Sequence, residues 1–144
     1  MPVNKLRILF LCYGNACRSQ MAEGWTRHLR GELIEPESAG IVASGLSGRA
    51  EQVMAEAGVD ISSQVSNTLD EMRRRPYDCM VTLCPTAHSL CPPLEGVNVV
   101  HVPFDDPYTE CFGIEGSEDE LKIFRRVRDE IKAFVETLPE SLEK

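Results

Sequence analysis

The chain has 144 residues, of which 42% are hydrophobic, and it carries a formal net charge of −8. This length predicts a single domain, residues 1–144, with one buried core, and the acidic balance argues against nucleic-acid binding, which depends on neutralising phosphates. Because no run approaches the roughly 18 apolar residues of a membrane span, and the apolar start is too short for a secretion signal, we expect a cytoplasmic monomer without membrane contact.

The first predicted element is a strand over residues 7–11, an apolar run that ends directly before Cys12. A loop follows, and residues 19–30 then have the pattern of a helix. Backbone N–H groups of such a loop and the positive end of a helix can both point at one bound anion. The residues expected to surround that anion are Tyr13, Gly14, Asn15, Ala16, Cys17, Arg18 and Ser19.

Three side chains of this loop indicate nucleophilic chemistry. Arg18 presents a planar fork of donors that suits a tetrahedral oxyanion. The same positive field favours the thiolate form of Cys12, which is the nucleophilic form. Ser19 carries a hydroxyl that can form a hydrogen bond to this thiolate. Cys17 has an alternative use, because it could protect Cys12 by forming a disulfide with it.

Further strands are predicted over residues 35–41, 78–83 and 97–102, and further helices over 49–57 and 118–137. The last helix begins with Ser117 as N-cap and Glu120 three residues on, the pattern of a capping box. Alternating strands and helices predict an α/β fold, a three-layer sandwich in which a four-stranded parallel sheet is flanked by helices on both faces. Ligands of such sheets bind at the carboxyl ends of the strands, where Cys12 lies.

A second pair of cysteines, Cys84 and Cys91, follows the third predicted strand. Cys84 sits at a strand end, as Cys12 does, so both can face one crevice. The two thiols could be unrelated, or they could bind a metal together with His88. The metal hypothesis lacks a fourth ligand and fits no common zinc spacing. We favour the third interpretation, a redox relay.

The spacing within this relay predicts a conformational change. If residues 85–91 form a helix, Cys84 and Cys91 lie about 10 Å apart along its axis, at roughly 1.5 Å per residue. A disulfide needs Cα atoms within about 7 Å of each other. Oxidation would therefore have to unwind the segment, whose stability as a helix is limited by Pro85, Pro92 and Pro93. We expect a redox switch whose oxidised form exposes the disulfide to a reductant.

A general acid is also needed, because a thiolate that attacks an oxyanion expels an oxygen leaving group. Asp106, directly before Pro107 in the loop that follows the fourth strand, is the best candidate, and Asp105 is a neighbouring or surface carboxylate. The remaining residues of chemical interest receive no catalytic role. Cys79 is expected in the core, Cys111 is unassigned, and His28 and His101 are expected to be structural.

Residues 12–19 resemble the active-site loop of the low-molecular-weight protein tyrosine phosphatase fold, and residues 19–25 resemble that fold's thioredoxin-coupled arsenate reductase branch. Segments 38–40, 81–84, 104–107 and 126–131 extend the resemblance along nearly the whole chain. Phosphatases of the fold usually carry proline after the serine, where this chain has Gln20. Tyr13 and Ala16 stand where the reductases usually have threonine and serine, and Tyr108 follows Pro107 as it often does in the phosphatases.

The resemblance implies the reduction of arsenate to arsenite for arsenic detoxification. Cys12 would attack arsenate held by Arg18 and the loop amides while Asp106 protonates the departing oxygen. Cys84 would then attack the Cys12–arsenic adduct, releasing arsenite and leaving a Cys12–Cys84 disulfide. Cys91 would convert this to a Cys84–Cys91 disulfide, which thioredoxin reduces.

The resemblance also implies a potassium ion near the loop, at positions that correspond to Asn15, Glu23, Ser38 and Asn67. Asn67 replaces an aspartate, so the donor set differs from that of the family. We expect no tightly bound cofactor.

Two other functions are kept as alternatives. A low-molecular-weight protein tyrosine phosphatase would need Cys12, Arg18 and Asp106 but would have no use for Cys84 and Cys91. A redox- or metalloid-sensing module, in which the state of the cysteines controls binding to another protein, would need no Asp106. Arsenate and phosphate are nearly isosteric, so the loop suits both anions and the reductase could retain phosphatase activity.

Overall fold

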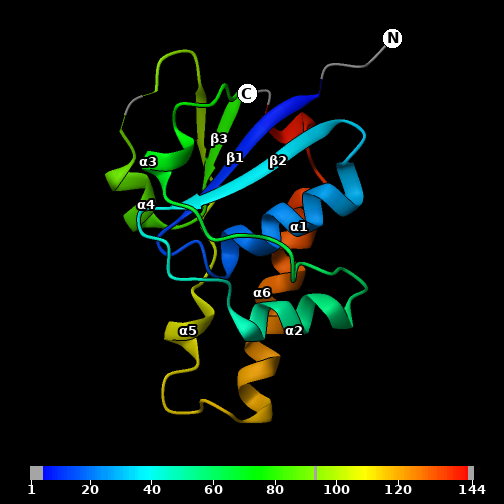
Figure 1. Cartoon of the computed structure of the whole chain (residues 1–144). Helices are drawn as coiled ribbons and strands as arrows, with labels where there is room; N and C mark the ends of the chain where they lie inside the picture. Colours follow the sequence, from blue (N-terminus) through cyan, green and yellow to red (C-terminus); the bar gives the residue numbers. More distant parts are fainter. Residues whose placement is uncertain (1–4, 93, 143–144) are drawn as a thin grey trace.

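The computed structural model describes residues 5–92 and 94–142, so Pro93 lies outside the described residues. Its strands are β1 (Leu6–Cys12), β2 (Ile34–Gly40), β3 (Cys79–Thr82) and β4 (Asn98–His101). They form one parallel sheet in the order β2-β1-β3-β4 (Figure 1). This confirms the predicted four-stranded parallel sheet, and each strand end lies within one residue of its predicted position.

The buried central strand β1 fixes the position of Cys12. Its residues Ile8 to Leu11 are fully buried, because β2 and β3 pair on either side and helices cover the sheet. Cys12 ends the strand and pairs with Gly40 of β2, while Leu11 pairs with Thr82 of β3. Since all strands are parallel, the loops that follow them meet at one edge of the sheet.

The three long helices confirm the predicted ones. They are α1 (Arg18–Arg30), α2 (Gly48–Glu56) and α6 (Glu118–Val135). A fourth helix, α4 (Pro85–Leu90), fills the segment between Cys84 and Cys91, which was predicted only conditionally. Three short elements were not predicted, namely α3 (Leu69–Met72), α5 (Pro107–Glu110) and the 3-10 helix η1 (Glu140–Leu142).

The helices cover the sheet in two layers. Helix α1 packs on β1 and β2 and against α6, which also contacts α2, whereas α4 packs on β1 and β3 and α3 on β2. Figure 1 shows α1, α2 and α6 gathered on one side of the sheet, with α3 and α4 on the other. None of the described helices combines the length and apolar character needed to cross a bilayer.

The capping box predicted at Ser117 forms only in its first half. Ser117 Oγ accepts a hydrogen bond from the Glu120 backbone N–H at 3.2 Å. The Glu120 carboxylate turns inward instead of back to the cap, because it pairs with Arg49 at 2.5 Å and lies 3.8 Å from the sulfur of Cys111. A full capping box forms at Thr68 and Glu71, and it starts the unpredicted helix α3.

Candidate active site

A cavity of about 370 Å³ opens at the carboxyl ends of the strands, beside the loop that joins β1 to α1. Six residues of this loop line it, namely Cys12, Tyr13, Gly14, Ala16, Cys17 and Arg18. The opposite wall comes from residues 44–48, Asp106 and Tyr108. The loop that was predicted to bind an anion therefore borders a cavity, formed where three strand-end loops meet.

The guanidinium of Arg18 lies at the floor of this cavity, with its side chain only 11% exposed. Its Nη1 donates to the Phe104 carbonyl oxygen at 3.2 Å, and its Nη2 lies 3.8 Å from a carboxylate oxygen of Asp106. Anchoring one nitrogen on backbone leaves the rest of the planar fork available to a tetrahedral anion. Arg18 is also the first residue of α1, so the helix dipole adds to its charge.

Cys12 receives a directed hydrogen bond from Ser19, whose Oγ lies 2.8 Å from the sulfur. The direction follows from Asn15, whose amide is oriented by the Asn67 backbone N–H, a donor to Asn15 Oδ1 at 2.7 Å. Asn15 Nδ2 therefore donates to Ser19 Oγ at 2.8 Å and to Ser38 Oγ at 3.0 Å. Because Ser19 Oγ accepts this bond, its own proton is free to point at Cys12, which stabilises the thiolate.

Asn15 and Ser19 were predicted to surround the anion, but their side chains do not line the cavity. Both are fully buried and turned beneath the loop. Asn15 adopts a φ of 48°, a left-handed conformation that asparagine tolerates better than most residues. The two residues shape the loop and hold Cys12, while its other residues line the cavity.

Gly40 at the end of β2 allows the loop to lie directly on the sheet. A Cβ atom there would stand 2.6 Å from the Asn15 backbone nitrogen and 2.7 Å from the Tyr13 carbonyl oxygen. Both atoms belong to the backbone of the anion loop, which could not give way without changing its shape. Gly40 was noted within a resembling segment, but its role depends on this close approach and cannot be read from the pattern.

We expect Gly40→Ala to lower the melting temperature by several degrees and to weaken anion binding. Overpacking of this kind costs about 1–3 kcal/mol, and in a chain of this size each kcal/mol corresponds to roughly 2–4 °C. Thermal melts with and without phosphate measure both effects. Gly48→Ala is the control for the melting temperature without phosphate, because a Cβ at Gly48 meets nothing within 4 Å. Equal phosphate stabilisation of Gly40→Ala and wild type would contradict this role.

Asp106, the predicted general acid, lies at the cavity wall near Arg18. It is also the N-cap of α5, because its Oδ1 accepts from the Tyr108 N–H at 3.0 Å and its Oδ2 accepts from Thr109 Oγ1 at 3.1 Å. Asp105 points elsewhere and pairs with Arg126 at 3.1 Å on the surface. Of the two neighbouring carboxylates, Asp106 alone lines the cavity among the described residues.

Cys84 lies in a shallower groove that adjoins the cavity. Tyr13, Arg18 and Asp106 line both hollows, so Cys84 and Cys12 face one continuous depression. Cys84 Sγ caps helix α4 by accepting from the Ala87 N–H at 3.4 Å.

Cys91 lies at the C-terminal end of α4, whereas Cys84 lies at its N-terminal end. The surroundings of the Cys91 sulfur favour the protonated thiol. Its sulfur lies 3.5 Å from Met80 Sδ and 3.4 Å from the Pro92 carbonyl oxygen. Burial raises the pKa of the Cys91 thiol. All six cysteines are free thiols, so neither the Cys12–Cys17 nor the Cys84–Cys91 disulfide is present in this state.

The three other cysteines are buried thiols. Burial raises the pKa of Cys79 to about 11, as expected for a core thiol, and raises that of Cys17 well above its usual range, helped by the nearby Cys12. Cys111 is buried behind Glu120. The described residues contain no group of three or more histidine, cysteine or carboxylate side chains placed to hold a metal ion, which leaves the metal hypothesis at Cys84, His88 and Cys91 without support.

Sequence reasoning missed one wall of the cavity, which residues 44–48 form. Ser47 caps α2 by accepting from the Ala50 N–H at 3.2 Å, so this wall is also the start of a helix. The signal was a Ser- and Gly-rich stretch directly after a predicted strand, at the same sheet edge as Cys12.

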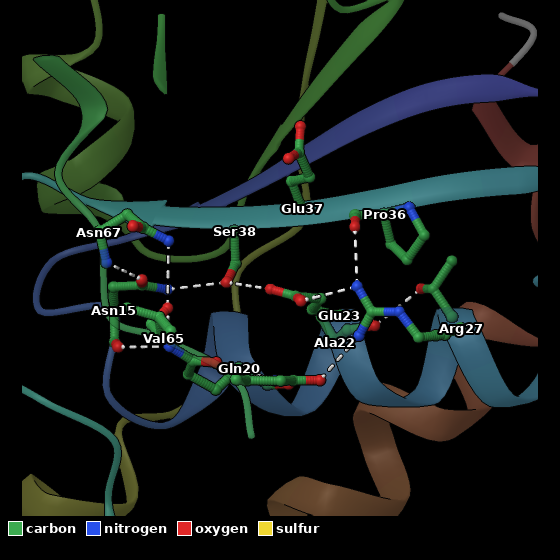
Figure 2. A network of polar contacts seen from close by, with 12 residues as sticks. Asn15, Gln20, Ala22, Glu23, Arg27, Pro36, Glu37, Ser38, Val65 and Asn67 are labelled. Atoms are coloured by element: carbon green, nitrogen blue, oxygen red, sulfur yellow. Dashed lines mark hydrogen bonds and ion pairs between the residues drawn. The ribbon is translucent and has the colours of Figure 1, made fainter. Parts of the chain in front are cut away.

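The four positions that correspond to a potassium site, Asn15, Glu23, Ser38 and Asn67, lie close together (Figure 2). The positive charge beside them comes from the guanidinium of Arg27. Ser38 Oγ donates to Glu23 Oε1 at 2.6 Å, and Arg27 Nη2 pairs with Glu23 Oε2 at 2.8 Å. The same Arg27 nitrogen donates to the Pro36 carbonyl oxygen at 3.1 Å.

The amide groups at this place also point the wrong way for a cation. Asn15 turns its Nδ2 toward Ser38, and Asn67 donates its own Nδ2 to the Val65 carbonyl oxygen at 3.1 Å. Potassium needs oxygen ligands, whereas these side chains present N–H groups and a guanidinium. The residues present therefore do not fit a potassium ion.

Comparison with known proteins agrees with this geometry. A model of the family described as low molecular weight phosphotyrosine protein phosphatase matches residues 7–144. An arsenate reductase of Halalkalibacterium halodurans is 44% identical over 141 residues, which cover 96% of this chain and 99% of that protein.

Solved structures give the same result. An arsenate reductase in the phosphate binding state superposes with a TM-score of 0.80 at 30% identity, covering 96% of this chain and 99% of that one. A thioredoxin-dependent arsenate reductase of Corynebacterium glutamicum has a TM-score of 0.72 at 25% identity, covering 99% of this chain and 64% of that one. The chain therefore belongs to the low molecular weight phosphotyrosine protein phosphatase family and, within it, to the arsenate reductases.

Proposed function

We propose that the chain reduces arsenate to arsenite through Cys12, Cys84 and Cys91, with thioredoxin as the electron donor. The observation that carries the proposal is the continuous depression in which Arg18 and Asp106 border both Cys12 and Cys84. A nucleophile, an anion clamp, an acid and a second thiol thus meet at one sheet edge. A sensing module would have no use for Asp106 at the cavity wall.

In the first step, arsenate binds to Arg18 and the loop N–H groups, and the Cys12 thiolate attacks arsenic. A sulfur–arsenic bond forms, and an arsenic–oxygen bond breaks. Asp106 gives its proton to the departing oxygen, which leaves as water. Arsenic remains As(V) at this stage, so no electrons have yet been transferred.

In the second step, the Cys84 thiolate attacks the sulfur of Cys12. A Cys12–Cys84 disulfide forms, and the electron pair of the sulfur–arsenic bond goes to arsenic, which leaves as As(III) in arsenite. The Cys91 thiolate then attacks the Cys84 sulfur and releases the Cys12 thiolate. Two thiols have become one disulfide, which balances the two electrons given to arsenic.

The position of Cys91 imposes a conformational step on this scheme. Helix α4 separates Cys84 from Cys91, and burial raises the pKa of the Cys91 thiol, so both the distance and the burial disfavour its attack while the helix is closed. Opening brings the two sulfurs together and exposes the new disulfide to thioredoxin. The cycle needs a reducing compartment such as the cytoplasm, and one chain acting as a monomer supplies every group.

The direct test is NADPH oxidation in the presence of arsenate, thioredoxin and thioredoxin reductase. We expect NADPH oxidation that depends on both arsenate and the chain. Failure with thioredoxin but turnover with a different thiol donor would keep the reductase and replace the partner. Absence of arsenate-dependent oxidation with every donor would reject the proposal.

Hydrolysis of aryl phosphates is a second candidate activity, favoured by the size of the cavity. Its 370 Å³ exceeds what a bare oxyanion fills, and the exposed rings of Tyr13 and Tyr108 stand at its border. Such a hydrolysis would use Cys12, Arg18 and Asp106 but neither Cys84 nor Cys91. Release of nitrophenol from p-nitrophenyl phosphate, unchanged in Cys84→Ser, is the expected sign of it.

We expect potassium to have no specific effect on this chain, because Arg27 already supplies a positive charge to Glu23. Melting temperature and turnover should be equal in KCl and NaCl at the same ionic strength. Arg27→Ala should lower the melting temperature by about 3 °C, which corresponds to roughly 1 kcal/mol.

Arg73→Ala is the matched control, since among the described residues the Arg73 side chain makes one long surface pair, with Asp70 at 3.8 Å. It should leave the melting temperature unchanged. A wild-type chain that gains stability or turnover in KCl over NaCl would contradict the assignment.

A further inference from the structure

Two histidine rings meet beside the relay cysteines, at the carboxyl ends of two strands. His88 lies on α4, and His101 ends β4, where it pairs with Thr82 of β3. The rings are stacked with centroids 4.3 Å apart and an interplanar angle of 26°. Nδ1 of each ring lies 2.9 Å from Thr82 Oγ1. We refer to Thr82, His88 and His101 as the histidine cluster.

One hydroxyl serves both imidazoles. Thr82 has a single hydroxyl proton, which it can donate to one Nδ1 or to the Val100 carbonyl oxygen at 3.5 Å, while the hydroxyl oxygen accepts from the remaining ring N–H. Thr82 is fully buried in β3. The cluster therefore connects a buried residue of the sheet to the exposed helix α4.

Helix α4 has few other attachments to the rest of the chain. It has six residues, and Ala87 is its one buried side chain among the described residues. Cys84 caps its first turn, and the large side chain of Leu90 is 55% exposed. Among the hydrogen bonds of the described residues, that of His88 to Thr82 is the one that ties a side chain within α4 to the sheet. A short helix held this lightly is marginal by itself.

The histidine cluster is incompatible with a Cys84–Cys91 disulfide. The cluster requires residues 85–90 to be helical, because His88 reaches Thr82 from the middle of that helix. A disulfide requires the Cα atoms of Cys84 and Cys91 to come within about 7 Å, which seven helical steps of about 1.5 Å do not allow. Whatever stabilises the helix therefore stabilises the dithiol.

We propose that His88, acting with Thr82 and His101, is a positioning residue that holds α4 on the sheet and thereby sets the redox potential of the Cys84–Cys91 pair. This rests on the proposed relay. Oxidation of the pair removes two protons and two electrons, and the electrons pass to arsenic over the whole proposed cycle or to a disulfide in the buffer. Because the cluster exists only in the dithiol form, it makes the pair a stronger oxidant and eases its reduction by thioredoxin.

The test is the equilibrium of the full chain with a reduced and oxidised dithiothreitol buffer at pH 7, without arsenate. The Cys84–Cys91 disulfide is quantified by alkylation and peptide mass mapping. We expect His88→Ala to shift the equilibrium about tenfold toward the disulfide, which is about 30 mV to more negative potential. Alanine is a better helix former than histidine, so a purely local effect on α4 would shift it the other way.

Companion variants separate the contacts. Thr82→Val, which removes the shared hydroxyl, should shift the potential in the same direction as His88→Ala and serves if that variant is poorly folded. His88→Asn keeps a polar atom near the position of Nδ1 and should recover part of the wild-type potential. Ser89→Ala, on the exposed side of the same helix, is the control for helix propensity alone and should shift the equilibrium slightly toward the dithiol, opposite to His88→Ala.

The outcomes are distinguishable. A wild-type chain that never forms the Cys84–Cys91 disulfide, in this buffer or after arsenate turnover, would overturn the proposed relay. A wild-type chain that forms it with the same potential as His88→Ala and Thr82→Val would overturn the role of the histidine cluster and leave the relay standing.

Discussion

The Cys91→Ser variant is expected to reduce one equivalent of arsenate and then stop. Cys12 and Cys84 adjoin the same depression, so the first two steps need no other thiol. Serine at position 91 cannot attack the Cys12–Cys84 disulfide, and the nucleophile stays locked in it. Coupled NADPH oxidation should therefore fall by at least about a hundredfold, while a single-turnover burst of arsenite remains.

Mass mapping of the variant after arsenate treatment should find a Cys12–Cys84 disulfide, whereas wild type should contain Cys84–Cys91. Cys111→Ser is the matched control, because Cys111 is a free thiol that contacts Tyr108 and Glu120 and belongs to neither relay step. Steady turnover of Cys91→Ser with thioredoxin would show that Cys91 is dispensable and would rule out the three-cysteine scheme.

Asp106→Asn is expected to slow the arsenate step by about 10²- to 10⁴-fold, the usual contribution of a positioned acid. Asparagine is as good an N-cap as aspartate, so it can still accept from the Tyr108 N–H and keep α5 in place. The loss should therefore reflect the missing proton. The rate of arsenite release in a single turnover measures the affected step directly.

Asp105→Asn provides the comparison, since Asp105 is the adjacent carboxylate but pairs with Arg126 on the surface. Its rate should stay within about twofold of wild type, because surface pairs contribute little. Similar losses in both variants would mean that the loop responds to charge in general, and the acid would have to be sought elsewhere.

The sequence was sufficient to predict the nucleophilic loop, because its determinants are local. Cys12, Arg18 and Ser19 lie within eight residues, and the flanking apolar strand and helix are strong patterns. The sheet order β2-β1-β3-β4 then places Cys84 beside this loop through strand pairing alone. Cys84 and Cys91, the cysteines of the proposed relay, were recognisable as a pair because they flank a segment that directly follows a predicted strand.

Long-range contacts explain most of what was not predicted. Residues 44–48 line the cavity only because the chain returns past the loop after β2. The stacking of His88 on His101 depends on how α4 settles against β4, which no local pattern specifies. The capping box at Ser117 failed for a similar reason, since Arg49 of another helix attracts the Glu120 carboxylate.

Two features had local signals that were available but unused. Asp106 before Pro107 is the N-cap and first-turn pattern of a helix, and it starts α5. Glu23 and Arg27 are four residues apart on one helix, the spacing of an ion pair. This ion pair argues against a potassium site, because it places the Arg27 guanidinium beside the Glu23 carboxylate that the metal would need.

The burial of three bystander thiols bears on how the enzyme survives its own product. Arsenite is a soft species that binds cysteine thiolates, and a chain with six cysteines offers it many partners. Burial raises the pKa of Cys17, Cys79 and Cys111, which disfavours the thiolate form that arsenite binds. In the proposed relay, Cys12, Cys84 and Cys91 would be protected differently, because each of them would spend part of every cycle in a disulfide that arsenite cannot bind.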